Sequence, residues 1–224
     1  MAILHHYAFC PHSRFVRLTM GEMGLEPEIS EERPWAREEG FLRMNPSGTT
    51  PVFLENDIAI PGAGVIAEYL DETRGLGMNG RRLLPGDPAG RVEVRRLLEW
   101  FNSKFYDEVT GYLVTEKIIK RFSGEAPDAG AIRAARSNMR YHLRYIGFLC
   151  ADRNWLAGDH MTYADLAAAA HLSCADYLGD VPWDEDELAK EWYARVKSRP
   201  AFRSLLADRV PGMTPPSHYA DLDF

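Results

Sequence analysis

The chain has 224 residues, a formal net charge of −7 and three cysteines. The acidic charge argues against nucleic acid as the main partner, because phosphate binding favours a basic surface. The odd number and wide separation of Cys10, Cys150 and Cys174 exclude a dense disulfide framework and fit a reducing compartment. Residues 1–9 lack a basic start followed by a long apolar run, and no stretch approaches the roughly 20 apolar residues of a membrane span. We therefore expect a cytoplasmic protein without membrane insertion.

The first part of the chain carries the elements of a small mixed domain. Short apolar runs predict four strands, at residues 3–7, from Ile29, at 52–54 and at 57–60. Two helices are expected among them, one from Pro11 to Gly24 and one over residues 65–70. Proline favours the first position of a helix and glycine its end. The predicted order is therefore βαβ followed by ββα over residues 1–74.

Residues 75–90 are rich in glycine and contain two prolines, which is typical of a linker between domains. Everything from residue 91 to about 208 shows helical periodicity. Helices are expected from Val92 past Phe105 and over residues 131–149, 165–178, 188–197 and 200–206. Residues 209–224 form a proline-containing tail. The chain is thus predicted to hold a mixed domain, a linker, an all-helical domain and a tail.

Four passages together resemble the glutathione S-transferase family. In chain order they read FCPHSR at 9–14, NPSGTTP at 45–51, VIAEYL at 65–70 and LAGDHMTYADL at 156–166. They are similar to the Cys-Pro start of omega-class members, the Asn-Pro-x-Gly-x-x-Pro turn with its cis proline, the helix after the fourth strand, and the buried capping box of the helical domain. Thr162 and Asp165 have the capping-box spacing and are interpreted as folding elements. The resemblance implies a thioredoxin-like N-terminal domain, an all-helical C-terminal domain and a homodimer.

The resemblance is strongest to one branch of that family and covers the whole chain, including the ending HYADLDF at 218–224. Members of that branch act in bacterial cell division and bind filaments of the tubulin homologue FtsZ. The branch therefore implies a scaffold whose partner is the FtsZ filament.

Cys10 stands where the first helix begins. Unpaired N–H groups and the positive end of the helix dipole stabilise a thiolate there, which could attack a disulfide or form a mixed disulfide with glutathione. The alternative is a buried, inert thiol. Ser13 is a weaker nucleophile candidate and is expected to cap the helix or face the core. His5, His6 and His12 lack the spacing of a metal site, so structural or surface roles are expected and no metal is predicted.

A ligand pocket is implied by the family at Thr50, Pro51, Gly62 and Ala63. The residue before the cis proline, here Thr50, would offer its backbone to glutathione. Glutathione-binding members carry an acidic residue followed by serine at the helix start, and this pair falls on Gly62 and Ala63. Neither offers a side-chain hydrogen bond, and losing two charge-assisted bonds costs about 3–6 kcal/mol of binding. We therefore expect little or no glutathione binding, although the helix start could still dock an anion.

Two further features suggest contacts with a protein. Trp35 lies in a highly charged segment and is either an exposed interface residue or folds back over the core or the domain cleft. One row on the helix at 131–149 consists of arginines, at Arg133, Arg136, Arg140 and Arg144. This arginine row is either a solvated face or a dock for a carboxylate-rich segment.

The end of the tail alternates acidic and apolar residues, at Asp221, Leu222, Asp223 and Phe224. We expect this end to bind the partner. Residues 215–224 are expected to be dispensable for folding, because few apolar residues follow the last helix. The alternative is a brace that docks on its own subunit, for example on the arginine row.

Two functions fit these features. The first is a homodimeric scaffold with little or no catalysis and no cofactor, which binds the FtsZ filament through two copies of one surface. The second is a glutathione-dependent transferase or thiol transferase that uses Cys10. The side chains missing at Gly62 and Ala63 favour the first function, and Cys10 favours the second.

Overall fold

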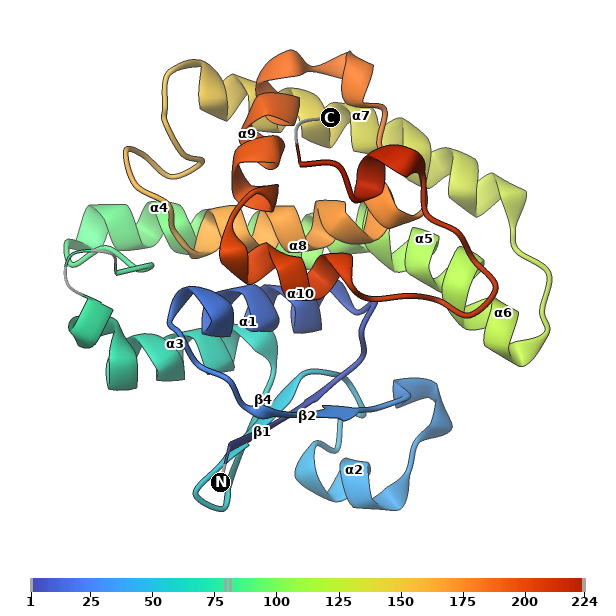
Figure 1. The fold of residues 1–224 in the computed structure, drawn as a ribbon, viewed down its shortest axis with the longest axis horizontal. Coiled ribbons are helices and arrows are strands. Elements are labelled where there is room, and N and C mark those ends of the chain that lie inside the picture. Colours follow the sequence, from blue (N-terminus) through green and yellow to red (C-terminus); the bar gives the residue numbers. More distant parts are fainter. Residues whose placement is uncertain (1, 79, 81, 223–224) are drawn as a thin grey trace.

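The computed structural model describes residues 2–78, 80 and 82–222. Its N-terminal part is a four-stranded sheet of order β2-β1-β3-β4, formed by β1 (Ala2–His6), β2 (Glu28–Glu31), β3 (Val52–Glu55) and β4 (Ile58–Pro61). β1 pairs in parallel with β2 and antiparallel with β3, and β3 pairs antiparallel with β4. Helices α1 (Pro11–Glu22) and α3 (Ala63–Arg74) lie between the sheet and the remaining helices, whereas α2 (Glu39–Met44) lies apart from them beside the sheet (Figure 1).

The second part is helical, as predicted. Its first long rod runs through α4 (Pro88–Glu99), a π-helical stretch (Trp100–Thr110), α5 (Gly111–Val114), a second π-helical stretch (Thr115–Ile119) and α6 (Lys120–Ser123). It is followed by α7 (Ala129–Ala151), α8 (Tyr163–Tyr177), α9 (Glu187–Lys197) and α10 (Arg203–Leu206). No helix in the described ranges is long and apolar enough to cross a membrane.

The expected linker is partly structured. A single turn of 3₁₀-helix covers Gly75–Met78, and α4 already begins at Pro88, inside the predicted linker. Asp87 caps α4, because its side chain accepts a hydrogen bond from the Gly90 N–H at 2.7 Å. Because of this cap, the helical rod begins earlier than its apolar periodicity indicated.

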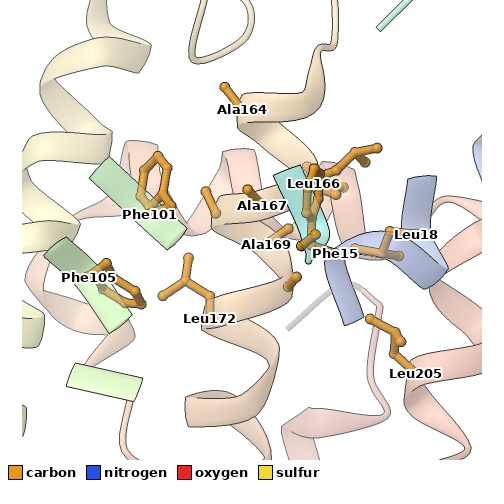
Figure 2. Packing of buried hydrophobic residues seen from close by; sticks show 14 of the residues in the cluster. Phe15, Leu18, Phe101, Phe105, Ala164, Leu166, Ala167, Ala169, Leu172 and Leu205 are labelled. Atoms are coloured by element: carbon orange, nitrogen blue, oxygen red, sulfur yellow. The ribbon is translucent and has the colours of Figure 1, made fainter. Parts of the chain in front are cut away.

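Helix α8 is the centre of the core, and all of its residues are buried. Figure 2 shows its alanines between Phe15 of α1 on one side and Phe101 and Phe105 of the π-helical stretch on the other. Alanine side chains let neighbouring helices approach closely, so α8 joins the two domains. Its start carries the predicted capping box, in which Thr162 and Asp165 satisfy backbone N–H groups reciprocally.

Arg14 on α1 reaches across the domain boundary and is completely buried. Its guanidinium donates to the Ser173 hydroxyl at 2.9 Å, to the Tyr219 hydroxyl at 3.4 Å and to Asp208 at 3.2 Å. It also donates to the Ala8 carbonyl at 2.8 Å. The Arg14 cluster, defined by these five residues, ties the first helix to α8 and to the end of the chain.

The structure argues against the expectation that residues 215–224 are dispensable for folding, because part of this segment is packed in the core. Tyr219 is fully buried in the core, and its hydroxyl donates to the Leu205 carbonyl at 3.1 Å. The neighbouring His218 ring lies 2.9 Å from the buried Asp176 carboxylate, and Lys197 donates to the His218 carbonyl at 2.8 Å. The tail therefore docks on its own subunit as a brace, although on α8 and α9 rather than on the arginine row. Of the predicted binding end, Asp223 and Phe224 lie outside the described residues.

Candidate functional site

A cavity of about 350 Å³ lies between the two domains. The N-terminal domain contributes the loop before α1, the turn around Trp35, the loop before β3 and the start of α3. The helical domain contributes the π-helical rod. The walls are mostly apolar or aromatic, and the residues that matter for its chemistry are Tyr7, Cys10, His12, Trp35, Thr50, Gly62, Ala63 and Tyr106. The structure thus brings the predicted pocket residues together with Cys10.

Cys10 is the N-cap residue of α1, as the sequence predicted. Its Sγ lies 3.5 Å from the Thr50 carbonyl oxygen, next to the cis Thr50–Pro51 bond. Burial by itself disfavours the thiolate. A hydrogen bond with His12, the charge of His12 and the Thr50 side chain outweigh that effect and lower the pKa of Cys10 to about 7. A sizeable fraction of Cys10 is therefore thiolate at neutral pH.

His12 is the functional residue that sequence reasoning missed. Its Nε2 lies 2.8 Å from the Asn102 carbonyl oxygen, so this nitrogen donates and the ring is held in place. Burial lowers the pKa of His12, but Cys10 and the Asn102 carbonyl raise it more. The net result is a pKa above the ordinary value for histidine. Each of the two side chains thus favours the charged form of the other, the thiolate of Cys10 and the imidazolium of His12. The available signal was a histidine two positions after a cysteine at a helix start.

The other predicted nucleophile is structural. Ser13 is fully buried, and its Oγ accepts a hydrogen bond from the Tyr7 N–H at 3.3 Å. This hydroxyl holds the turn before α1 and does not take part in the Cys10–His12 pair. The interpretation of Ser13 as a cap or core residue is the correct one.

The start of α3 presents backbone rather than side chains to the cavity. Gly62 is the N-cap with φ of 91°, a conformation that favours glycine, and no side chain caps the helix. Ala63 follows and is buried. The first turn of α3 therefore lacks the side-chain hydrogen bonds that the transferase pattern places there.

Trp35 folds over the domain cleft, which was one of the two alternatives. Its ring packs edge-on against Tyr7 with centroids 4.9 Å apart. It also stacks on Phe122 of the helical domain at 5.7 Å. Trp35 remains half-buried, and Phe122 is 40% exposed. The indole is therefore both a wall of the cavity and part of the surface at its rim.

The arginine row already has acidic partners within the chain. Arg136 forms an ion pair with the buried Asp180 at 2.5 Å, and Arg140 lies 3.3 Å from Glu185. Arg144 also pairs with Glu185. The carboxylate-rich segment on this face is thus the loop between α8 and α9. Arg133, at the beginning of the row, is exposed.

Metal ligation has no candidate in the ranges that the structure describes, since they contain no group of three or more histidine, cysteine or acidic residues placed to hold an ion.

Family models match both parts of the chain. The N-terminal domain of glutathione S-transferase matches residues 9–73, and its C-terminal domain matches residues 126–200. The chain belongs to the glutathione S-transferase family. It is 47% identical to FtsZ-localized protein A of Caulobacter vibrioides, over 99% of this chain and 97% of that protein.

Solved structures agree with this assignment. A glutathione S-transferase from Sinorhizobium meliloti has a TM-score of 0.96 at 51% identity, with all of both chains covered. The structure named FzlA from C. crescentus has a TM-score of 0.93 at 47% identity and covers 100% of this chain and 99% of that one.

Proposed function

We propose that this chain is a homodimeric scaffold of the transferase fold that binds FtsZ filaments in bacterial cell division and binds glutathione weakly or not at all. The observation that carries the proposal is its 47% identity, over nearly the whole chain, to a protein named for its localisation with FtsZ. A solved relative of 51% identity is named as a transferase. The relatives' names therefore support both an FtsZ-associated role and a transferase. The residues of the cavity are the evidence that favours one of these functions over the other.

The start of α3 supports weak glutathione binding. The acidic residue and serine that would hold the γ-glutamyl group are replaced by Gly62 and Ala63. Losing about 3–6 kcal/mol of charge-assisted hydrogen bonding weakens affinity by roughly 10²- to 10⁴-fold. The cavity between the domains is present, but it lacks the side chains that would hold the γ-glutamyl group of glutathione in a transferase.

An exposed apolar face supports the dimer. Val65 on α3 and Val92 on α4 are 58% and 66% exposed. The two helices are neighbours there, because Arg95 pairs with Glu68 at 2.8 Å. This face spans both domains, which fits a dimer joined between the N-terminal domain of one subunit and the helical domain of the other.

The rim of the cavity and the end of the tail are the proposed filament contacts. Trp35 and Phe122 form a half-exposed aromatic pair at the rim. Asp221 is exposed and Leu222 is half-buried beside α9. The arginine row is a weaker candidate, because three of its four arginines already pair with Asp180 or Glu185.

Co-sedimentation with polymerised FtsZ tests the proposal. We expect the wild-type chain to pellet with the polymer. Val92→Glu should sediment as a monomer and lose at least tenfold in filament affinity, since linked sites gain avidity. Ile29→Glu, at an exposed apolar position on β2, is the matched control and should behave like wild type. A wild-type chain that stays in the supernatant with filaments would overturn the proposal.

A thiol transferase is the second candidate, and the Cys10–His12 pair favours it. Calorimetric titration of glutathione separates the two functions. We expect no measurable binding at millimolar glutathione. A micromolar isotherm, together with turnover that Cys10→Ser abolishes, would establish the transferase instead.

A further inference from the structure

The cavity contains a polar group that the proposed scaffold does not use. Thr50 is 7% exposed and lines the cavity, yet its hydroxyl oxygen has no hydrogen-bond partner within residues 2–78, 80 and 82–222. Leaving a buried hydroxyl unpaired costs about 1–3 kcal/mol. Cys10 is its neighbour in the cavity, with the Cys10 Sγ 3.5 Å from the Thr50 carbonyl oxygen. An oxygen atom bonded to Cys10 would give the Thr50 hydroxyl an acceptor.

His12 supplies the second requirement, a proton donor beside the sulfur. Its Nε2 is committed to the Asn102 carbonyl at 2.8 Å, so the ring cannot turn away freely. Its hydrogen bond with Cys10 favours the protonated imidazolium while Cys10 is a thiolate. Cys10 and His12 therefore place a nucleophile and a proton donor in the same cavity.

We propose that Cys10 is an oxidation site of this chain, at which hydrogen peroxide converts the thiolate to a sulfenic acid. The Cys10 sulfur attacks one peroxide oxygen, an S–O bond forms and the O–O bond breaks. The leaving hydroxide takes the proton of His12 and departs as water. Sulfur is oxidised by two electrons and the peroxide is reduced by two. The Thr50 hydroxyl then donates to the new oxygen.

The other two cysteines are poor competitors. Burial raises the pKa of Cys150 and of Cys174 to about 12, so both remain thiols near neutral pH. Cys174 is fully buried and lies 3.5 Å from the Phe9 carbonyl, to which it donates. Because only the thiolate is a good nucleophile, oxidation should be confined to Cys10.

A small thiol can reduce the sulfenic acid back to cysteine, so the oxidation is reversible. A first thiol attacks the Cys10 sulfur, forming a mixed disulfide and releasing water. A second thiol attacks that disulfide, returning Cys10 and releasing the small-molecule disulfide. Oxidation of Cys10 is measured on the chain without the filament, so the two proposals can fail separately.

The test combines mass spectrometry with rates on the full chain. The chain is treated with hydrogen peroxide in the presence of dimedone, which traps sulfenic acids, and the adduct is mapped. We expect one adduct per chain, on Cys10, and none in Cys10→Ser. The trapping rate should rise with pH to a plateau with a midpoint near 7, the pKa of Cys10. An adduct mapped to Cys150 or Cys174 would overturn the proposal.

Three variants test the neighbouring groups. His12→Asn should slow oxidation at pH 7 at least tenfold and move the midpoint upward, because burial then dominates the pKa of Cys10. Thr50→Val should slow oxidation, whereas Thr50→Ser, which keeps the hydroxyl, should restore it. Melting temperatures confirm that each variant is folded. Wild-type oxidation no faster than that of a free cysteine with the same thiolate fraction would show that the cavity contributes nothing and would refute the site.

Discussion

Successive turns of one helix meet the rest of the molecule in opposite ways. At the beginning of α1, Cys10 and His12 face a cavity in which the Thr50 hydroxyl has no partner in the described part of the chain. A turn later, Arg14 is enclosed by acceptors from α8, Asp208 and the tail. The two regions therefore serve different purposes. The Arg14 cluster satisfies its own polar groups and stabilises the fold, whereas the cavity leaves groups open for an outside molecule.

Removing Arg14 should destabilise the protein more than any other change proposed below. Arg14→Ala removes a buried guanidinium and strands its acceptors, so the free energy of unfolding should fall by about 3–5 kcal/mol. Arg17→Ala is the matched control, because Arg17 lies on the same helix and also pairs with Asp208, at 2.8 Å. Its loss should cost less, about 1.5–3 kcal/mol, because the Arg17 side chain is 11% exposed whereas that of Arg14 is completely buried. Urea unfolding of both variants measures the contrast, and equal losses would mean that burial of Arg14 is not the cause.

A somewhat smaller effect is expected from the tail. Deleting residues 215–224 removes Tyr219 from the core and should lower the free energy of unfolding by about 3 kcal/mol. Deleting only residues 221–224 leaves Tyr219 in place and should change stability little. Thermal melts and FtsZ co-sedimentation are measured on both.

The two deletions separate bracing from recognition. If the short deletion melts like wild type and loses filament binding, the end of the tail is a recognition element. Filament binding that survives the short deletion would remove the tail from the proposed contacts and leave it as a brace alone.

A single hydroxyl added to the cavity should have a smaller effect. Ala63→Ser adds one hydroxyl at the start of α3, facing the cavity. One regained hydrogen bond should strengthen glutathione binding by up to about tenfold, or about 1.4 kcal/mol. Gly64→Ser is the control, because Gly64 lines a neighbouring hollow instead. Calorimetry at high glutathione compares them, and an equal gain in both variants would mean that the hydroxyl at position 63 is not an anchor.

Much of the fold could be predicted because its signals are local. The turn at residues 45–51 is determined by residues that are close in the sequence. Within it, the Asn45 side chain donates a hydrogen bond to the Thr49 carbonyl at 2.7 Å. The capping box likewise joins Thr162 and Asp165, three residues apart. Such patterns fix backbone geometry before any long-range contact forms. The position of Cys10 at a helix start belongs to the same class.

The rest of the site could not be predicted because it depends on partners far away in the sequence. The orientation of the His12 ring depends on the Asn102 carbonyl, which lies 90 positions away in the sequence. The sequence around Trp35 is compatible with two interpretations, and the stacking of Trp35 on the distant Phe122 decides between them. The low number of apolar residues in the tail predicts that it is dispensable, but one of its aromatic residues, Tyr219, is fully buried in the core.

The Arg14 cluster has a consequence for the synthesis of the protein. Arg14 leaves the ribosome 205 residues ahead of Tyr219. At about 5–20 residues per second, roughly 10–40 s pass before the last acceptor exists. During that time the Arg14 guanidinium lacks some of the hydrogen-bond acceptors that surround it in the folded protein. The contact between the first helix and the end of the chain can form only after translation is nearly finished, so a prematurely terminated chain lacks the closure that a complete one acquires.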